Sequence, residues 1–494
     1  MLKISTKLIN LSNYIAACNS YEALGVAPSV YDRLRKARIT VEQMIEGDTP
    51  VYGLNTGLGG NLDYRIPKDE IPAFQMQLLR GRAVAAGEPL PERTGRAITL
   101  ARILSAAIGV SGISVETFDH LVQVFNSGLS PVVPCHGSIG AGDLVQNACW
   151  ALAILGEGKL WYNGEQVDAV QALHKAGITI PTLQPKDALA LNNHSGLTVA
   201  VSASALHEAK RALEMIKAAT VLSFEGYGAN QSVLQDQLHK LRNAPGQSEC
   251  AQWMREQLEG SEHDPRRVQD PLSLRTVPAV TGAAQHLLDQ AISVWEDEAN
   301  GSSDSPVAAN SENMLSTINF HSPALALALE AVSLSLAGVA NASVQRMQKL
   351  MNPDLSGLPK YLTPIGNGSA GFVPTQKTAA SLLAEIRRHA MPAILDAVPV
   401  SDSVEDMAPM TSLAARKLTQ QTESLKLLSG LEALVSCQAL DLRAPAKTSK
   451  LAGSFRTALR QTVPMLSEDR AISSDIETAT NTLATYCELA SQPN

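Results

Sequence analysis

The stretch ALALALEAVSLSLAGVANA, residues 324–342, decides the predicted fold class of this chain. It is apolar on nearly every face of a helix, and Glu330 is its only charged residue. Because such a helix is stable only when other helices surround it, the stretch predicts the core of a helical bundle. It also favours packing against further subunits.

Other segments extend this prediction along the chain. Apolar residues at helical spacing, with a capping-type start and a glycine near the end, predict a helix at 94–110. Further long helices, several of the length found in extended bundles, are expected at 199–222, 278–300, 323–351, 378–390 and 414–441.

The predicted fold is therefore mainly α. Residues 1–200 form an N-terminal part in which helices alternate with glycine-rich loops, and these loops are the expected active-site loops. Residues 201–494 form a central and C-terminal helical bundle. Because no repeat or linker separates the two parts, we expect one structural unit.

Composition narrows the class of protein. Hydrophobic residues make up 45% of the 494-residue chain, which is enough for a large buried core. The 40 basic and 48 acidic residues are mixed along the chain without a basic stripe, so we expect no nucleic-acid partner. The six cysteines are scattered, which argues against a disulfide framework or a zinc site. We expect no stretch to be long and apolar enough to span a membrane, and a cytoplasmic location is the default.

Two glycine-rich loops interrupt the aliphatic pattern, YGLNTGLGGN at 52–61 and PCHGSIGAGD at 134–143. Tyr52 opens the first loop. A tyrosine there is usually a half-buried packing residue, but a phenol on a mobile loop can also act as a base if its pKa is lowered. The second loop has neither the lysine of a P-loop nor the spacing of a dinucleotide site, so it indicates only a close backbone approach.

Further polar residues stand beside apolar helical sequence, and each has a structural and a functional interpretation. The polar run at 192–195 indicates either a helix start that lines a cavity or a plain N-cap. Arg275 suits a bidentate carboxylate clamp, and equally a structural ion pair. Lys377 and Glu405 are solvated charges by default. The sequence shows no metal-ligand spacing and no nucleophile elbow, so we expect no metal site.

The order of these motifs is typical of one family. Over nearly its whole length the sequence resembles the histidine and phenylalanine ammonia-lyases. The resemblance implies a long-helix bundle of the aromatic amino-acid lyase type, usually a homotetramer whose active sites draw residues from several subunits. The matching stretches are YGLNTGLGG at 52–60, QMQLLRGRAVAAGEPL at 75–90, VVPCHGSIGAGDL at 132–144, LALNNHSG at 189–196, VQDPLSLRTVP at 268–278, SSDSPV at 302–307, INFHSPALALALE at 318–330, GFVPTQKTAASL at 371–382, SVEDM at 403–407 and QALDLR at 438–443.

The chain departs from the family where relatives build an electrophile. Relatives carry Gly-Ala-Ser-Gly-Asp, whose Ala-Ser-Gly tripeptide cyclises and loses water to give a methylidene-imidazolone. Here Ala141 is followed directly by Gly142 and Asp143, so the serine that supplies the methylidene carbon is missing. A modified tripeptide printed as one letter would be followed directly by aspartate, but Gly142 intervenes. We therefore expect a degenerate electrophile loop and no methylidene-imidazolone cofactor.

Several residues are retained from the family pattern. The resemblance makes Tyr52 the base that takes the β-proton, Arg275 the carboxylate anchor, and Glu405 the residue that faces the ring of the substrate. Asn193 is retained as well and is expected to help bind the carboxylate.

Other family positions are substituted. Leu272 replaces an active-site tyrosine, Arg82 replaces a histidine on the substrate side, and Lys377 replaces a neutral residue.

These departures point to a different leaving group. An unactivated amine is a poor leaving group, whereas a trimethylammonium departs as neutral trimethylamine without an electrophile. A polarised ring beside the β-carbon can take up the negative charge if donors stabilise it. This is the chemistry of the family's ergothionase branch, which converts the betaine ergothioneine to thiol-urocanate and trimethylamine.

On this hypothesis the substituted residues recognise the thioimidazole betaine. Lys377 stabilises charge on the ring or sulfur, and Arg82 is a further candidate for the sulfur end. Phe320 is a candidate for contact with the trimethylammonium group. The expected partner is thus a small amino acid or betaine, with other copies of the chain forming the tetramer.

Two alternatives stay open. An ordinary ammonia-lyase or aminomutase would need the electrophile, and its ultraviolet absorbance or a dehydrated peptide would reveal it. A non-catalytic paralogue would keep only the fold, and the retention of Tyr52, Arg275 and Glu405 argues against it. Histidine betaine is a narrower alternative within the leading class.

Overall fold

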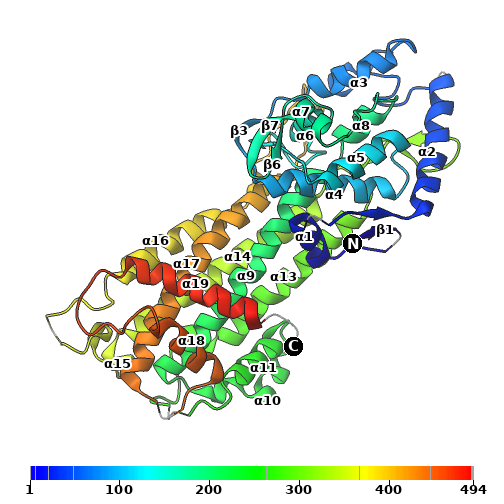
Figure 1. Ribbon diagram of the computed structural model, residues 1–494. Coiled ribbons are helices and arrows are strands. Elements are labelled where there is room, and N and C mark those ends of the chain that lie inside the picture. Colours follow the sequence, from blue (N-terminus) through cyan, green and yellow to red (C-terminus); the bar gives the residue numbers. More distant parts are fainter. Residues whose placement is uncertain are drawn as a thin grey trace. The chain divides into compact units, whose positions relative to one another are not determined.

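The structure forms long helices at the segments where the sequence is apolar at helical spacing (Figure 1). The computed structural model describes residues 2–5, 7–20, 22–47, 49–262, 265–366, 368–445 and 447–490. Each of the five long helices predicted beyond residue 199 is present and differs from its predicted range by a few residues at most. They are α9 (Gly196–Tyr227), α13 (Val277–Asn300), α14 (Pro323–Leu350), α16 (Thr375–His389) and α17 (Thr411–Arg443). The mainly α prediction is confirmed.

The chain forms two compact units. The first unit comprises Met1–His207, Ile292–Leu329 and Pro392–Arg416, and the second comprises Glu208–Ala291, Glu330–Met391 and Lys417–Asn494. The boundary predicted at residue 200 lies near the end of the first of these segments. The organisation as one structural unit stays a prediction.

Shorter helices and small sheets build the first unit. Helix α4 corresponds to the helix predicted at 94–110 and is buried around most of its circumference. The helices that lie wholly within this unit, α4 included, are α1 (Leu11–Asn19), α2 (Pro28–Glu46), η1 (Gly59–Asn61), α3 (Ile71–Arg80), α4 (Glu92–Ala107), α5 (Val115–Ser127), α6 (Leu144–Ile154), α7 (Ala169–Lys175), α8 (Asp187–Asn192) and η4 (Ala393–Leu395).

The strands of the first unit are short. Strand β1 (Lys3–Ile4) pairs parallel with β2 (Gly25–Val26), and β3 (Ala86–Pro89) pairs antiparallel with β5 (Pro134–His136). An antiparallel three-stranded sheet has the order β4 (Ser130–Pro131), β6 (Lys159–Tyr162), β7 (Glu165–Asp168). A last pair joins β8 (Val307–Ala308) and β9 (Met314–Leu315).

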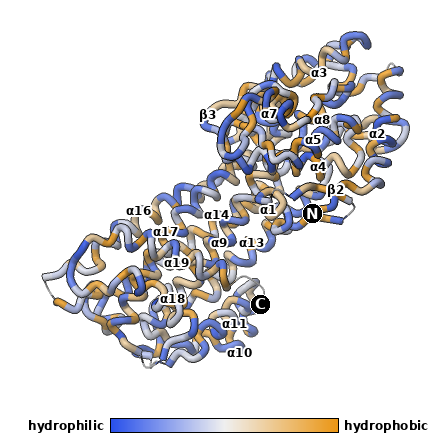
Figure 2. Tube along the Cα trace, in the orientation of Figure 1, coloured by the Kyte–Doolittle hydropathy of each residue, from blue (hydrophilic) through white to orange (hydrophobic). Residues whose placement is uncertain are grey.

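Short helices complete the second unit around its portions of the long helices. These are η2 (Gln231–Leu234), α10 (Asp236–Arg242), α11 (Gln247–Gln257), α12 (Leu272–Arg275), α15 (Pro353–Ser356), η3 (Lys360–Leu362), α18 (Lys450–Arg460) and α19 (Ser473–Ala490). Figure 2 shows apolar residues recurring along the whole length of the long helices, as expected for helices that pack on several sides.

Helix α14 corrects one expectation from the sequence. Within the described residues it is long and apolar enough, by length and composition, to cross a membrane. Half of its most apolar window is buried inside the structure, and a mostly buried core helix passes the same test. The expectation that no stretch would pass was wrong because a bundle core and a membrane both select apolar side chains on every face.

A buried ion pair crosses the core of the second unit. The guanidinium of Arg346 donates to both carboxylate oxygens of Glu432, at 2.6 and 3.0 Å, and also to the hydroxyl of Thr220 at 2.9 Å. The side chains of Arg346 and Glu432 are 1% and 0% exposed. The hydroxyl of Ser223 donates to the same carboxylate at 2.5 Å. Removing the guanidinium would leave this carboxylate buried without its counter-charge.

We expect Arg346→Met to lower the free energy of unfolding by about 3–5 kcal/mol, because an uncompensated buried charge is strongly destabilising. The measurement is denaturant unfolding followed by circular dichroism. The matched control is Arg80→Met, which removes the exposed pair between Arg80 and Glu157 and should change stability much less, because solvent screens an exposed pair. Equal losses in the two variants would contradict the assignment.

Candidate active site

Tyr52, Arg82 and Glu405 are brought together in the first unit. Tyr52 is half-buried, and its hydroxyl accepts a hydrogen bond from the Gly59 N–H at 3.1 Å. Arg82 lies just beyond α3, and its Nη1 donates to the Leu78 carbonyl at 3.2 Å. Burial lowers the pKa of the Arg82 guanidinium, while the nearby groups of Tyr52 and Glu405 act in the opposite direction. Arg82 therefore interacts electrostatically with the phenol of Tyr52 and with the carboxylate of Glu405.

Glu405 lies at the end of a tight loop. Val400 and Glu405 form an antiparallel bridge, with N–H to carbonyl distances of 3.0 and 3.3 Å. Between them Ser401, Asp402 and Ser403 all have positive φ, at 54°, 55° and 66°. Non-glycine residues pay roughly 1–2 kcal/mol each for this conformation, so the surrounding contacts must hold it. The Ser401 hydroxyl provides one of them by donating to Glu405 Oε1 at 2.9 Å.

The degenerate electrophile loop is tied to two distant segments. The Gly142 N–H donates to the Phe320 carbonyl at 2.9 Å, and Ala141 forms a bridge with His321. The Gly142 carbonyl accepts from the His194 N–H at 3.2 Å and from Asn147 Nδ2 at 3.2 Å. The predicted residues at 141–143, 193 and 320 thus lie in one place.

The side chain of Asp143 holds this loop in place through hydrogen bonds. Its carboxylate is 1% exposed and accepts the Thr198 N–H at 2.7 Å, the Thr198 hydroxyl at 2.9 Å and the hydroxyl of Ser138. Burial raises the pKa of Asp143, although these hydrogen bonds act in the opposite direction. Asp143 therefore has a structural position at the start of α6.

No room for a side chain exists at Gly142. Its φ is +76°, a conformation that favours glycine, and a Cβ added there would overlap Oδ1 of Asn193. The family's electrophile requires a dehydrated serine between an alanine and a glycine. The residues at 141–143 do not fit that group, because the serine is missing.

The two groups of site residues are connected along the chain and through the backbone. Five residues after Glu405, the Met410 N–H donates to the Ile139 carbonyl at 2.9 Å. A Cβ added at Gly60, in the loop that begins with Tyr52, would meet Asp402 Oδ2 at 3.1 Å. These contacts link the segment that carries Glu405 to the loop at 134–143 and to the loop that begins with Tyr52.

Arg275 and Lys377 belong to the second unit and are described within it. Arg275 ends α12 and is half-buried, and its buried Nε has no hydrogen-bond partner among the described residues. Lys377 lies in the first turn of α16 with an exposed side chain. Leu272, at the start of α12, is 62% exposed.

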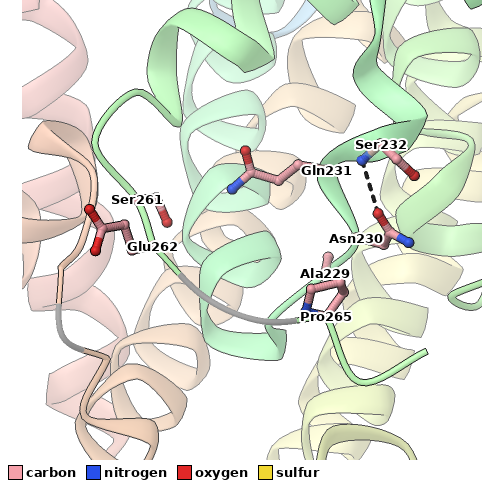
Figure 3. Close-up of a pocket in the computed structure, with 7 residues that line it drawn as sticks. All are labelled: Ala229, Asn230, Gln231, Ser232, Ser261, Glu262 and Pro265. Atoms are coloured by element: carbon pink, nitrogen blue, oxygen red, sulfur yellow. Dashed lines mark hydrogen bonds between the residues drawn. The ribbon is translucent and has the colours of Figure 1, made fainter. Parts of the chain in front are cut away.

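A separate hollow of about 580 Å³ lies in the second unit (Figure 3). Among the described residues, its lining contains a single charged residue and none of the predicted site residues. The lining residues are Ala229, Asn230, Gln231, Ser232, Ser261, Glu262 and Pro265. Among the described residues no group of three or more His, Cys, Asp or Glu side chains is arranged to hold a metal ion.

A buried charge cluster that the sequence did not predict lies beside Asn193. Arg102 and Asp304, both fully buried, form a bidentate pair with two distances of 2.9 Å. Next to Asp304 in sequence, the Ser305 carbonyl accepts from Asn193 Nδ2 at 3.4 Å. Lys186 is also fully buried, and its Nζ has no hydrogen-bond partner among the described residues. The stretch at 302–307 carries a family motif, but nothing in its sequence indicates that its aspartate is paired.

Because of Lys186, the free energy of unfolding is expected to rise as the pH rises. Burial lowers the pKa of Lys186 from 10.5 to about 8, and Arg102 adds to this while Asp304 and Asp187 oppose it. Between these pH values the unfolded chain binds a proton that the native protein does not, so rising pH favours the native state.

We expect the free energy of unfolding of the wild type, measured relative to Lys186→Met, to rise between pH 8 and 10.5, by up to about 3 kcal/mol in total. Denaturant unfolding at several pH values would measure this difference. Lys240→Met, at an exposed lysine of α10, serves as the control and should show no such trend. A difference that stays constant for Lys186→Met would refute the assigned burial of the charge.

Comparisons with known proteins agree with this architecture. Residues 9–461 match the family described as aromatic amino acid lyase. The chain is 35% identical over 492 residues to the histidine ammonia-lyase of Anaeromyxobacter sp. (strain K), covering 96% of this chain and 97% of that one. It is 35% identical over 476 residues to the histidine ammonia-lyase of Myxococcus xanthus, covering 95% and 94%.

Two solved structures share the whole fold. One is the ergothioneine-degrading enzyme ergothionase from Treponema denticola in complex with desmethyl-ergothioneine sulfonic acid, with a TM-score of 0.95, 29% identity and coverage of 99% and 100%. The other is the phenylalanine aminomutase of Pantoea agglomerans, with a TM-score of 0.93, 29% identity and coverage of 98% and 99%. This chain is a carbon–nitrogen lyase and belongs to the aromatic amino acid lyase family.

Proposed function

We propose that this lyase eliminates trimethylamine from ergothioneine to give thiol-urocanate, without a methylidene-imidazolone of its own. The observation that carries the proposal is the loop at 141–143, which lacks the serine from which the family's electrophile is made. The likeness to the Treponema denticola ergothionase, at a TM-score of 0.95, supports it.

The reaction needs a base and a stabilised ring. Tyr52, as phenolate, removes the β-proton, the β-carbon electrons form the double bond, and the bond from the α-carbon to nitrogen breaks. Trimethylamine leaves as a neutral molecule, and the proton on Tyr52 is later released to solvent. Because the leaving group carries its positive charge from the start, no covalent bond to the protein is required.

The remaining residues hold the substrate. Arg275 binds the carboxylate through its guanidinium, whose buried Nε lacks a partner among the described residues, with Asn193 as a helper. Glu405 binds a ring nitrogen. Arg82, which interacts electrostatically with both Tyr52 and Glu405, faces the sulfur end.

Two further contacts each involve a positive charge, one on the protein and one on the substrate. Lys377 stabilises negative charge on the thioimidazole in the transition state. The ring of Phe320 contacts the trimethylammonium group. Phe320 is half-buried, and its carbonyl is already bound to Gly142.

We also propose that the protein is a homotetramer with shared sites, as the family resemblance implies. Exposed apolar residues seven positions apart on α14 support this, because Leu327 is 57% and Leu334 is 54% exposed in the single chain. Large exposed apolar side chains in a row are typical of an interaction surface.

One alternative retains support. The two relatives named above are histidine ammonia-lyases that are 35% identical to this chain, which favours elimination of ammonia from histidine. That reaction needs the activation that the family's electrophile supplies, and the loop at 141–143 lacks its serine.

We expect the purified protein to convert ergothioneine to trimethylamine and a new conjugated ultraviolet absorber. The two products should form in equal amounts, because one elimination releases both. Histidine and phenylalanine are the controls and should not react. Turnover of either amino acid with no turnover of ergothioneine would sink the proposal in favour of an ammonia-lyase.

We expect Lys377→Met to reduce kcat with ergothioneine by at least about 10²-fold, since it removes a charge that stabilises the transition state. Folding should be unchanged because Lys377 is exposed. The control variant Lys240→Met removes another exposed lysine and should keep wild-type kcat. Near-normal activity of Lys377→Met would show that its assigned role is wrong.

A further inference from the structure

The turn that leads into Glu405 is built from residues that do not suit its backbone. The Val404 N–H donates to the Ser401 carbonyl at 3.1 Å, which closes the turn. Its two central residues, Asp402 and Ser403, have φ values of +55° and +66°. A turn with positive φ at both central residues prefers asparagine, aspartate or glycine at the first and glycine at the second. Asp402 meets the first preference, but Ser403 does not meet the second.

Ser401, the residue before this turn's centre, is strained in the same way. Its φ is +54°, a conformation that glycine adopts without cost and that a serine side chain opposes. Ser401 and Ser403 are both exposed, so no burial of apolar surface offsets the strain. Glycine at either position would make the turn more stable. Strained residues that persist beside a functional group are candidates for a functional role.

The two serines differ in what their hydroxyl groups contact. The Ser401 hydroxyl donates to Glu405 Oε1 at 2.9 Å. The Ser403 hydroxyl makes no hydrogen bond with any of the residues that the structure describes. The backbone of Glu405 is already bound to Val400 through both its N–H and its carbonyl. The freedom that remains to Glu405 is that of its half-buried side chain, and the Ser401 hydroxyl restricts it.

The carboxylate of Glu405 has a competing partner in the same unit. The Arg82 guanidinium interacts electrostatically with it, and arginine readily binds a carboxylate through both oxygens. A carboxylate turned fully toward Arg82 would be less available to the ring of a substrate. The hydrogen bond from Ser401 to Oε1 opposes that rotation, because the rotation would break it.

We infer that Ser401 is a positioning residue for Glu405, whose Oε1 it holds through its hydroxyl so that Oε2 is left for the ring of the substrate. The strain at position 401 is retained because glycine, which would relieve it, has no hydroxyl. The inference deepens the proposed function, since it rests on the role of Glu405 as the ring contact. It does not depend on which leaving group the substrate carries.

The first test separates the fold from the function and uses no turnover. Ser401→Gly and Ser403→Gly are made in the full-length protein, and their melting temperatures are compared with that of the wild type. Both changes relieve the same kind of backbone strain, so we expect neither variant to be less stable than the wild type. Clear destabilisation by Ser401→Gly would assign this serine to the fold and overturn the inference.

The second test compares the turnover of the same two variants. We expect Ser401→Gly to lower kcat/KM by about ten-fold, the loss that one hydrogen bond to a charged group accounts for. Ser403→Gly is the matched control and should keep the wild-type value. Ser401→Asn should recover most of the loss, because asparagine tolerates positive φ and its amide is a hydrogen-bond donor. Equal kcat/KM values for the two glycine variants would overturn the inference.

The third test assigns the effect to Glu405. In a Glu405→Ala background, Ser401→Gly should cause no further loss of kcat/KM, because no carboxylate remains to be positioned. The same loss in that background as in the wild type would show that Ser401 acts elsewhere, and would overturn the inference. Both kinetic tests use whichever substrate the wild type turns over, ergothioneine or histidine. Turnover of histidine alone would therefore count against the proposed function, while the contrast between the variants would still decide this inference.

Discussion

The backbone N–H and carbonyl of Gly142 bind to segments that are far apart in the sequence. Its N–H is bound to Phe320 and its carbonyl to His194, so residues 142, 194 and 320 meet at one point. A backbone group buried in this way must be satisfied, which gives the loop one geometry. Bridging of Ala141 with His321 adds to the same tie. The positions of Asn193 and Phe320 follow from it.

Buried charges lie next to this arrangement and restrict its geometry. The pair of Arg102 and Asp304 is fully enclosed, and Asp304 is the neighbour of the residue that accepts from Asn193. Lys186 adds a further buried cation, which neutralises readily because burial lowers its pKa to about 8. Ion pairs of this kind contribute little net stability compared with apolar packing, but they tolerate few alternative geometries. They suit a site in which a carboxamide and a glycine must fit closely.

The chemistry proposed for the site depends on a simple exchange. A family electrophile activates a poor leaving group, and a trimethylammonium substrate brings a good one. The loop at 141–143 can then be short and closed, while a base, a guanidinium and a carboxylate remain grouped as Tyr52, Arg82 and Glu405. The tight turn before Glu405, with three residues at positive φ, is the kind of strained segment that persists only where surrounding contacts hold it.

The sequence by itself determined the long helices and the order of the motifs, because apolar periodicity and local composition are properties of a single segment. It also showed that the serine is missing between Ala141 and Gly142. Only the tertiary structure decided that Asn193 fills the space beside Gly142 and that Ser401 holds Glu405. The first contact joins residues far apart in the chain, and the second depends on the positive φ angles of the turn at 401–403, so no local pattern of residue types records either one.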